Sequence, residues 1–170
     1  MELICCPKTS VAEVCRDHLP SHVLTFASPG TPQPSLPAGP AHLHLAFNDI
    51  AEPRAGLVAP AEAHARDILA FGRSWDGARP LLVSCEAGIS RSTAALFIIA
   101  CERRPDLAEQ ALADRLRAAA PCATPNPLLV SLADRILGRQ DRMILATAAI
   151  GRGADYVPYR SVLITLPPLG

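Results

Sequence analysis

The sequence predicts an α/β fold in which a mainly parallel central sheet is flanked by helices, in a single domain over residues 1–170. Short apolar segments rich in β-formers alternate along the chain with longer segments whose apolar residues have helical spacing. The chain is 49% hydrophobic, which is enough apolar material for one domain with its own core.

Four short apolar segments have the length and composition of buried strands. They are "ELICC" (2–6), "HVLTFA" (22–27), "HLHLAF" (42–47) and "RPLLVSC" (79–85), the last bounded by Pro80. Because helical segments or long connections separate them, we expect the strands to pair in parallel.

Six segments have the spacing of amphipathic or buried helices. They are residues 10–19, 60–75, 92–104, 107–120, 126–139 and 141–151. Ser10 is expected to cap the first helix, Pro60 to lie near the first turn of the second, and Gly151 to end the last.

Two segments outside these elements differ in character. Residues 28–41, the Pro-rich connection, contain five prolines, and proline fixes φ and removes a hydrogen-bond donor. We expect an extended surface crossing there, with a lip over a site as the alternative. The C-terminal tail, residues 152–170, fits either a short edge strand or a packed extension.

Composition argues against several classes of protein. The 16 basic and 16 acidic residues cancel, so overall charge does not favour nucleic acid or a membrane surface as partner. The N-terminus lacks the pattern of a signal peptide, and no apolar stretch reaches the roughly 18–20 residues of a membrane span. The six cysteines form no C-x-x-C pair. We therefore expect no metal site, and interpret the cysteines as reduced thiols of a cytoplasmic protein.

The segment "LLVSCEAGISRSTAALF" carries the most specific chemistry, because a buried strand ends at Cys85 and a helix begins near Ser92. A helix N-terminus presents unpaired N–H groups and the positive end of a dipole, and ligands of open α/β sheets bind beyond the strand ends. Gly88 lets the loop bend, and Arg91 can grip two phosphate oxygens. The residues of the expected phosphate cradle are Glu86, Ala87, Gly88, Ile89, Ser90 and Arg91. These positive surroundings also favour a thiolate at Cys85.

Cys85-Glu86-Ala87-Gly88-Ile89-Ser90-Arg91-Ser92 resembles the Cys-x5-Arg-Ser/Thr signature of the cysteine-dependent protein tyrosine phosphatase superfamily, and "AGISRS" resembles its dual-specificity branch. "RAAAPCATPNPLLVSLADRIL" is similar to the helical region of that branch, including its Pro-Asn pair. The resemblance covers residues 42–138, a little over half of the chain.

The resemblance implies a phosphatase that hydrolyses phosphomonoesters through a cysteinyl-phosphate intermediate, without metal or cofactor. Its substrates would be proteins phosphorylated on tyrosine, serine or threonine, or a small phosphoester. Cys85 would attack phosphorus, Arg91 and the loop amides would hold the oxygens, and Ser92 would donate a hydrogen bond to the sulfur.

An aspartate some thirty-odd residues before the cysteine is the superfamily's general acid. Asp49 lies 36 residues before Cys85 and directly follows a predicted strand, whereas the rival Glu52 lies 33 residues before it. We favour Asp49 because aspartate is the superfamily's residue and because Pro53 places Glu52 in a rigid turn.

Two departures from the pattern leave a second function open. Ser84 stands where the superfamily usually has histidine, and Glu86 puts a carboxylate into the loop. A Glu86 side chain that points outward would affect only the rim of the site. One that points into the loop would raise the pKa of the Cys85 thiol and oppose the binding of phosphate. The alternative function is therefore a phosphate-binding pseudophosphatase that acts as an interaction module. A rhodanese-like or arsenate-reductase-like enzyme is a third hypothesis, against which Asp49 and the serine-led helix argue.

Three further sets of residues have mainly structural interpretations. Cys5 and Cys6 end the first strand, near the expected site, and a protective disulfide with Cys85 is an alternative to free thiols. His42 and His44 share one face of a strand, but no third metal ligand accompanies them. Tyr156 and Tyr159 are expected to pack the tail rather than to stack on a substrate. The sequence does not indicate an oligomeric state.

Overall fold

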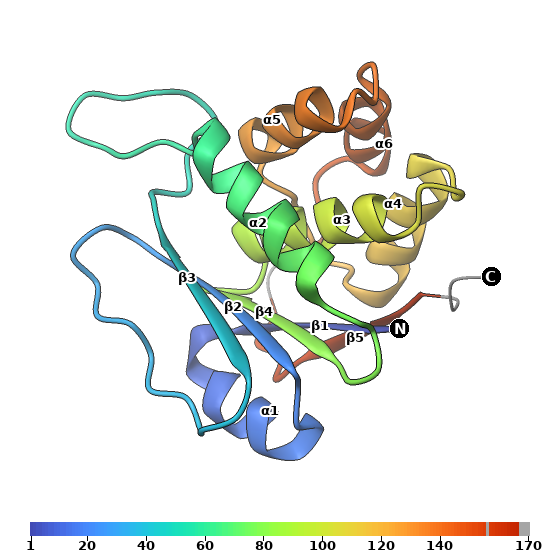
Figure 1. The fold of residues 1–170 in the computed structure, drawn as a ribbon. Coiled ribbons are helices and arrows are strands. Elements are labelled where there is room, and N and C mark those ends of the chain that lie inside the picture. Colours follow the sequence, from blue (N-terminus) through green and yellow to red (C-terminus); the bar gives the residue numbers. More distant parts are fainter. Residues whose placement is uncertain (156, 167–170) are drawn as a thin grey trace.

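The computed structural model describes residues 1–155 and 157–166; residue 156 and residues 167–170 of the predicted tail lie outside the described residues. Its sheet has five strands in the order β3-β2-β4-β1-β5 (Figure 1). The strands are β1 (Glu2–Pro7), β2 (His22–Ala27), β3 (Ala41–Ala46), β4 (Leu81–Cys85) and β5 (Val162–Thr165). The four predicted strands are confirmed, with boundaries that differ by at most two residues.

The six predicted helices are also confirmed. They are α1 (Val11–His18), α2 (Glu62–Ser74), α3 (Arg91–Arg103), α4 (Glu109–Ala119), α5 (Pro127–Leu137) and α6 (Arg142–Ile150). The cap predicted at Ser10 is wrong in part: Ser10 precedes α1, but its side chain makes no cap hydrogen bond. A 3-10 turn, η1 (Lys8–Ser10), leads into α1 and already holds Ser10 near helical dihedral angles. Gly151 ends α6, as predicted.

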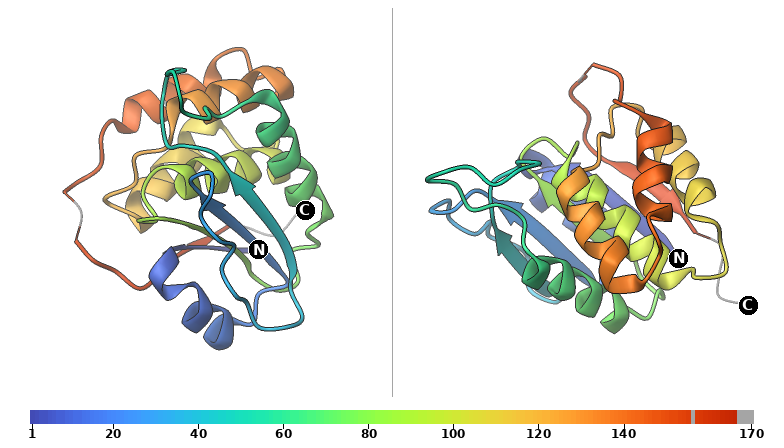
Figure 2. Two further views of the ribbon diagram at one scale, coloured as in Figure 1. Left: turned by 90° about the vertical axis from the view of Figure 1, so that its left-hand side faces the viewer. Right: turned by 90° about the horizontal axis from the view of Figure 1, so that it is seen from above.

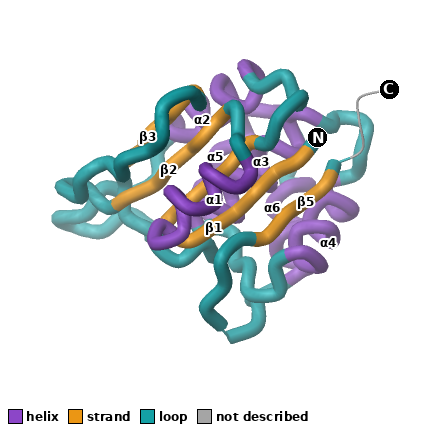
Figure 3. Tube along the Cα trace, turned by 90° about the horizontal axis from the view of Figure 1, so that it is seen from below, coloured by secondary structure: helices purple, strands orange, loops and turns teal. Residues whose placement is uncertain are grey.

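The helices divide unequally between the two faces of the sheet. The helix α1 covers one face beside β1, and α2 to α6 lie on the other (Figures 2 and 3). Strand residues alternate between the two resulting cores. In β4, Val83 and Cys85 belong to the larger core under α3, whereas Leu82 belongs to the smaller core under α1. This alternation directs the side chain of Cys85 toward α3.

Strand order places β4 in the middle of the sheet. It pairs in parallel with β1 on one side and with β2 on the other, so the carboxyl ends of all three strands lie at one edge. Pro7 of β1 is the register partner of Cys85. The loop after Cys85 therefore emerges between two neighbouring strand ends, where ligands of open α/β sheets bind.

The tail adopts the edge-strand alternative. Strand β5 pairs antiparallel with β1, with Val162 opposite Cys5, so the sheet is mixed and mostly parallel. This pairing brings the segment before β5 toward the loop that follows Cys85. The Pro-rich connection forms neither helix nor strand until β3 begins at Ala41.

The C-terminal helices are joined through two buried carboxylates. Glu109 of α4 accepts a hydrogen bond from Arg139 at 3.1 Å and another from Arg142 at 3.1 Å. Asp134 of α5 accepts from the backbone N–H groups of Asp141 and Met143, both at 2.9 Å, at the start of α6. Asp134 thus satisfies N–H groups that a helix start leaves without intrahelical partners.

Replacing Asp134 by alanine should lower the free energy of unfolding by about 1–3 kcal/mol, because two N–H groups lose their acceptor. Asp114→Ala, at an exposed position of α4, should change it by less than about 0.5 kcal/mol. Urea unfolding followed by circular dichroism measures both values. Equal, small losses in the two variants would contradict this role of Asp134.

Candidate active site

Cys85 is the last residue of β4, and α3 begins at Arg91, so the predicted strand-loop-helix is present. The Cys85 side chain is almost fully buried, and its sulfur lies 3.1 Å from the hydroxyl of Ser92 in the first turn of α3. Gly88, midway along the loop, has φ of +73°, a left-handed conformation that glycine adopts without strain.

The loop's carbonyl groups are bonded from outside the loop. Gly88 O accepts from the hydroxyl of Tyr159 at 2.6 Å, and Ile89 O accepts from Thr124 N at 2.9 Å. Ser90 O accepts from Asn126 N at 3.3 Å. Because these carbonyls are bound to other segments, the loop can leave its N–H groups to an anion, as a cradle at a helix N-terminus does.

Arg91 is buried at the start of α3, with 4% of its surface exposed. Its Nη1 donates a hydrogen bond of 2.7 Å to the carbonyl of Phe47, just beyond β3. Its Nε is buried and has no hydrogen-bond partner among the described residues. A buried donor without an acceptor is costly, so this N–H fits a site completed by an anionic ligand.

Asp49 lies on the loop after β3 and contacts the loop that follows Cys85 directly. Its Oδ1 accepts from the Ser90 hydroxyl at 2.7 Å and from the Asn126 side chain at 2.8 Å. Its Oδ2 lies 3.9 Å from Arg91 Nε. Glu52, the rival, is exposed and makes no hydrogen bond or ion pair with any described residue. The structure therefore brings Asp49, and not Glu52, to Cys85's loop.

Two asparagines hold the Asp49 loop in place, and the sequence interpretation assigned neither of them a role. Asn126 is buried at the N-cap of α5, where its Oδ1 accepts from Leu129 N while its Nδ2 also donates to Ile50 O. Asn48 closes the base of the loop through two hydrogen bonds with the backbone of Val58, at 2.7 and 2.9 Å. The Pro-Asn pair before a helix was the available signal for Asn126.

The two departures from the signature have different outcomes. Glu86 takes the outward alternative: its side chain is 60% exposed and pairs with Lys8 at 2.5 Å. Such a surface pair contributes little to stability. The hydroxyl of Ser84 is buried and has no hydrogen-bond partner in the described part of the chain. Ser84 thus makes no bond that orders the loop.

The rear of the loop is closed by Tyr159 and Cys5. Tyr159, expected only to pack the tail, donates a hydrogen bond to the loop after Cys85, because the pairing of β5 with β1 carries it there. The Cys5 sulfur lies 3.2 Å from Ser92 Oγ and 3.3 Å from Gly88 O, either of which can accept its one hydrogen. All six cysteines are free thiols, so the disulfide alternative is not formed.

The two histidines of β3 bond a hydroxyl of the neighbouring strand. His42 and His44 each lie 2.8 Å from the hydroxyl of Thr25, and the described residues contain no cluster of three metal-ligating side chains.

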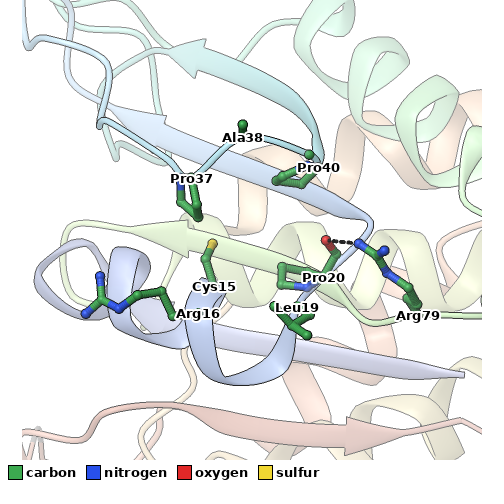
Figure 4. Close-up of a pocket in the computed structure, with 9 residues that line it drawn as sticks. Cys15, Arg16, Leu19, Pro20, Pro37, Ala38, Pro40 and Arg79 are labelled. Carbon is green, nitrogen blue, oxygen red and sulfur yellow. Dashed lines mark hydrogen bonds between the residues drawn. The ribbon is translucent and has the colours of Figure 1, made fainter.

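No helix in the described part of the chain is long and apolar enough to cross a membrane. A hollow of about 330 Å³ lies between α1 and the Pro-rich connection and is lined in part by Cys15 and Arg79 (Figure 4). Its lining residues do not include Cys85.

Comparison with known proteins identifies the fold. No family model and no curated protein matches the chain. Among solved structures, DUSP15 matches with 19% identity and a TM-score of 0.63, over 87% of this chain and 89% of that one. Human DUSP28 matches with 22% identity and a TM-score of 0.62, over 81% and 94%. Human tyrosine phosphatase-like serine/threonine/tyrosine-interacting protein matches with 18% identity and a TM-score of 0.62, over 81% and 92%. The chain thus has the fold of the dual-specificity phosphatases, which confirms the predicted fold.

Replacing Gly88 by alanine should weaken the binding of inorganic phosphate by about tenfold or more. A residue with a Cβ is strained by about 1–2 kcal/mol in the left-handed conformation of Gly88, and about 1.4 kcal/mol corresponds to a tenfold change in affinity. The added Cβ would clash with the Tyr159 hydroxyl and would lie 3.1 Å from the carbonyl carbon of Cys6. Titration calorimetry measures the affinity.

Gly138→Ala is the matched control, because Gly138 has φ of +63° and no atom within 4 Å of an added Cβ. It should lose stability through φ alone and keep phosphate affinity. Equal phosphate affinity in the two variants would show that the conformation at Gly88 does not shape the cradle.

Proposed function

We propose that the protein is a cysteine-dependent phosphatase of the dual-specificity type, which hydrolyses phosphomonoesters through a cysteinyl-phosphate intermediate. One observation carries the proposal: Cys85 lies beneath a loop that also positions a buried Arg91 with an unpartnered N–H and holds Asp49 at its rim. Six free thiols fit a reducing compartment, so we place the enzyme in the cytoplasm.

In the first step the Cys85 thiolate attacks phosphorus in line with the leaving oxygen. Arg91 and the loop N–H groups bind the three remaining phosphate oxygens, where negative charge develops. Asp49 gives its proton to the leaving oxygen, so the phosphorus–oxygen bond breaks to release an alcohol and not an alkoxide. Ser90 and Asn126 hold Oδ1, which leaves Oδ2 to carry the proton.

In the second step a water molecule attacks the cysteinyl phosphate. Asp49, now a carboxylate, accepts a proton from that water, and the phosphorus–sulfur bond breaks with its electron pair remaining on sulfur. The Ser92 hydroxyl, 3.1 Å from that sulfur, stabilises the departing thiolate by a hydrogen bond. Both steps use only residues of this chain and water.

The substrate class that fits is a phosphorylated protein or a small phosphoester. Asp49 is one-third exposed, so the general acid lies at the rim of the site, where the leaving group of a bulky substrate would be. The phosphate-binding loop carries no lysine that would favour a polyphosphorylated headgroup.

A phosphate-binding pseudophosphatase is the second candidate, and the buried, unpartnered hydroxyl of Ser84 favours it. If the residue at position 84 does not order the loop, the loop stabilises the Cys85 thiolate less well. The similarity to a tyrosine phosphatase-like interacting protein supports the same candidate. Turnover of p-nitrophenyl phosphate separates the two functions.

Cys85→Ser should abolish hydrolysis of p-nitrophenyl phosphate and retain binding of inorganic phosphate, because Arg91 and the loop amides remain in place. The wild-type rate should be unaffected by EDTA. Steady-state assays and titration calorimetry make the two measurements. Hydrolysis that persists in purified Cys85→Ser protein would overturn the mechanism, and phosphate binding without wild-type hydrolysis would identify the pseudophosphatase.

Asp49→Asn should slow hydrolysis of phenyl phosphate by about 10²–10⁴-fold, the usual contribution of acid–base catalysis. The loss should shrink with p-nitrophenyl phosphate, whose leaving group departs without a proton. The measurement is the dependence of log kcat on the pKa of the leaving group.

Glu52→Gln is the matched control, from the same loop but without contacts to the site. Its dependence on the leaving group should follow that of the wild type. A steeper dependence for Glu52→Gln together with an unchanged one for Asp49→Asn would reverse the assignment.

A further inference from the structure

Cys5 of β1 lies beneath the candidate active site, where its thiol contacts polar groups of the loop and of α3. It is fully buried, and its side chain joins the larger core on the same face of the sheet as Cys85. The hydroxyl of Ser92 lies between the two sulfurs, 3.2 Å from that of Cys5 and 3.1 Å from that of Cys85. One hydroxyl thus contacts both thiols.

The protons available set the direction of these two hydrogen bonds. Burial raises the pKa of the Cys5 thiol far above its ordinary value, so Cys5 keeps its proton and can donate. Cys85 as a thiolate can only accept. Because a serine hydroxyl has a single hydrogen, Ser92 accepts from Cys5 and donates to Cys85.

A serine at this position has a competing bond. In the first turn of a helix, serine and threonine hydroxyls readily bond the carbonyl four residues earlier. Thr93 does so here, since its hydroxyl donates to Ile89 O. The corresponding carbonyl for Ser92 is Gly88 O, which already accepts from Tyr159 at 2.6 Å and lies 3.3 Å from the Cys5 sulfur. Tyr159 therefore occupies the acceptor that would turn Ser92 away from Cys85, and the Cys5 sulfur lies beside that carbonyl.

We propose that Cys5 is a positioning residue that directs the Ser92 hydroxyl toward the sulfur of Cys85 and thereby speeds hydrolysis of the cysteinyl phosphate. The inference rests on the proposed phosphatase function and adds a residue to it. As the phosphorus–sulfur bond breaks, the electron pair goes to the Cys85 sulfur, which the Ser92 hydrogen bond stabilises. The proton of the attacking water goes to Asp49, and Cys5 keeps its own.

The experiment is rapid mixing with p-nitrophenyl phosphate, which reports accumulation of phosphoenzyme as a burst of nitrophenol. Ser92→Ala should show a burst that the wild type lacks. Cys5→Ala should show one too, with kcat reduced about 3- to 10-fold, the range for one hydrogen bond. Cys5→Ser, which keeps a donor at the same place, should restore kcat and abolish the burst. The double variant Cys5→Ala/Ser92→Ala should be no slower than Ser92→Ala.

Cys6→Ala is the matched control for loss of a buried thiol from β1. Cys6 is equally buried, but it faces the smaller core on the opposite side of the sheet. Cys6→Ala should lose stability and show no burst. If Cys5→Ala fails to fold, Cys5→Val removes the donor while filling the space, and the same burst is expected.

Two results would overturn the role of Cys5 and leave the proposed function standing. One is a burst in Ser92→Ala without a burst in Cys5→Ala or Cys5→Val. The other is a double variant whose loss equals the product of the two single losses, since Cys5 would then act independently of Ser92. Absence of wild-type turnover would instead overturn the proposed function, and the inference with it.

Discussion

The candidate site depends on a buried cation. The Arg91 guanidinium lies almost entirely out of water at the start of α3, and a buried charge is costly unless other groups compensate it. The fold supplies part of that compensation: the Phe47 carbonyl binds Nη1, and the Asp49 carboxylate lies near Nε. Nε has no hydrogen-bond partner among the described residues. The end of β3 and the loop after β4 are therefore held together by the charge that would bind phosphate.

The loop around that cation is held by segments far apart in the chain. Tyr159 before β5, Thr124 and Asn126 before α5, and Lys8 after β1 each bond a backbone or side-chain group of the loop. Within the chain segment itself, only the first turn of α3 bonds the loop's carbonyls, through Thr93 and Ala94 to Ile89 O and Ser90 O. Its shape thus depends on the whole sheet edge. Asn126 joins it to the Asp49 loop, because its backbone N–H donates to Ser90 O and its side-chain amide donates to Asp49.

The cysteines show how alternation along a strand separates chemical roles. Cys5 and Cys6 are neighbours in β1 and equally buried, yet one contacts Ser92 and the other faces the core under α1. Burial raises the pKa of both thiols, so each is kept as a neutral side chain. Cys85 differs in position, because it ends its strand just before α3 and its sulfur contacts the Ser92 hydroxyl in the first turn of that helix.

The sequence by itself determined the strands, the helices and the Cys85–Ser92 loop, because hydrophobic periodicity and a contiguous motif are local properties. Asp49 was a candidate because the family resemblance implies an aspartate thirty-odd residues before the cysteine, and because Asp49 directly follows a predicted strand. Tertiary structure alone decided that Glu86 turns outward to Lys8 and that the Ser84 hydroxyl has no hydrogen-bond partner among the described residues. Both outcomes depend on residues that lie far from this loop in the sequence. It also decided that Tyr159 and Cys5 close the loop from behind. Those contacts require β5 to pair with β1 and β1 with β4, and strand pairing between distant segments is set by the packing of the whole sheet rather than by any local pattern.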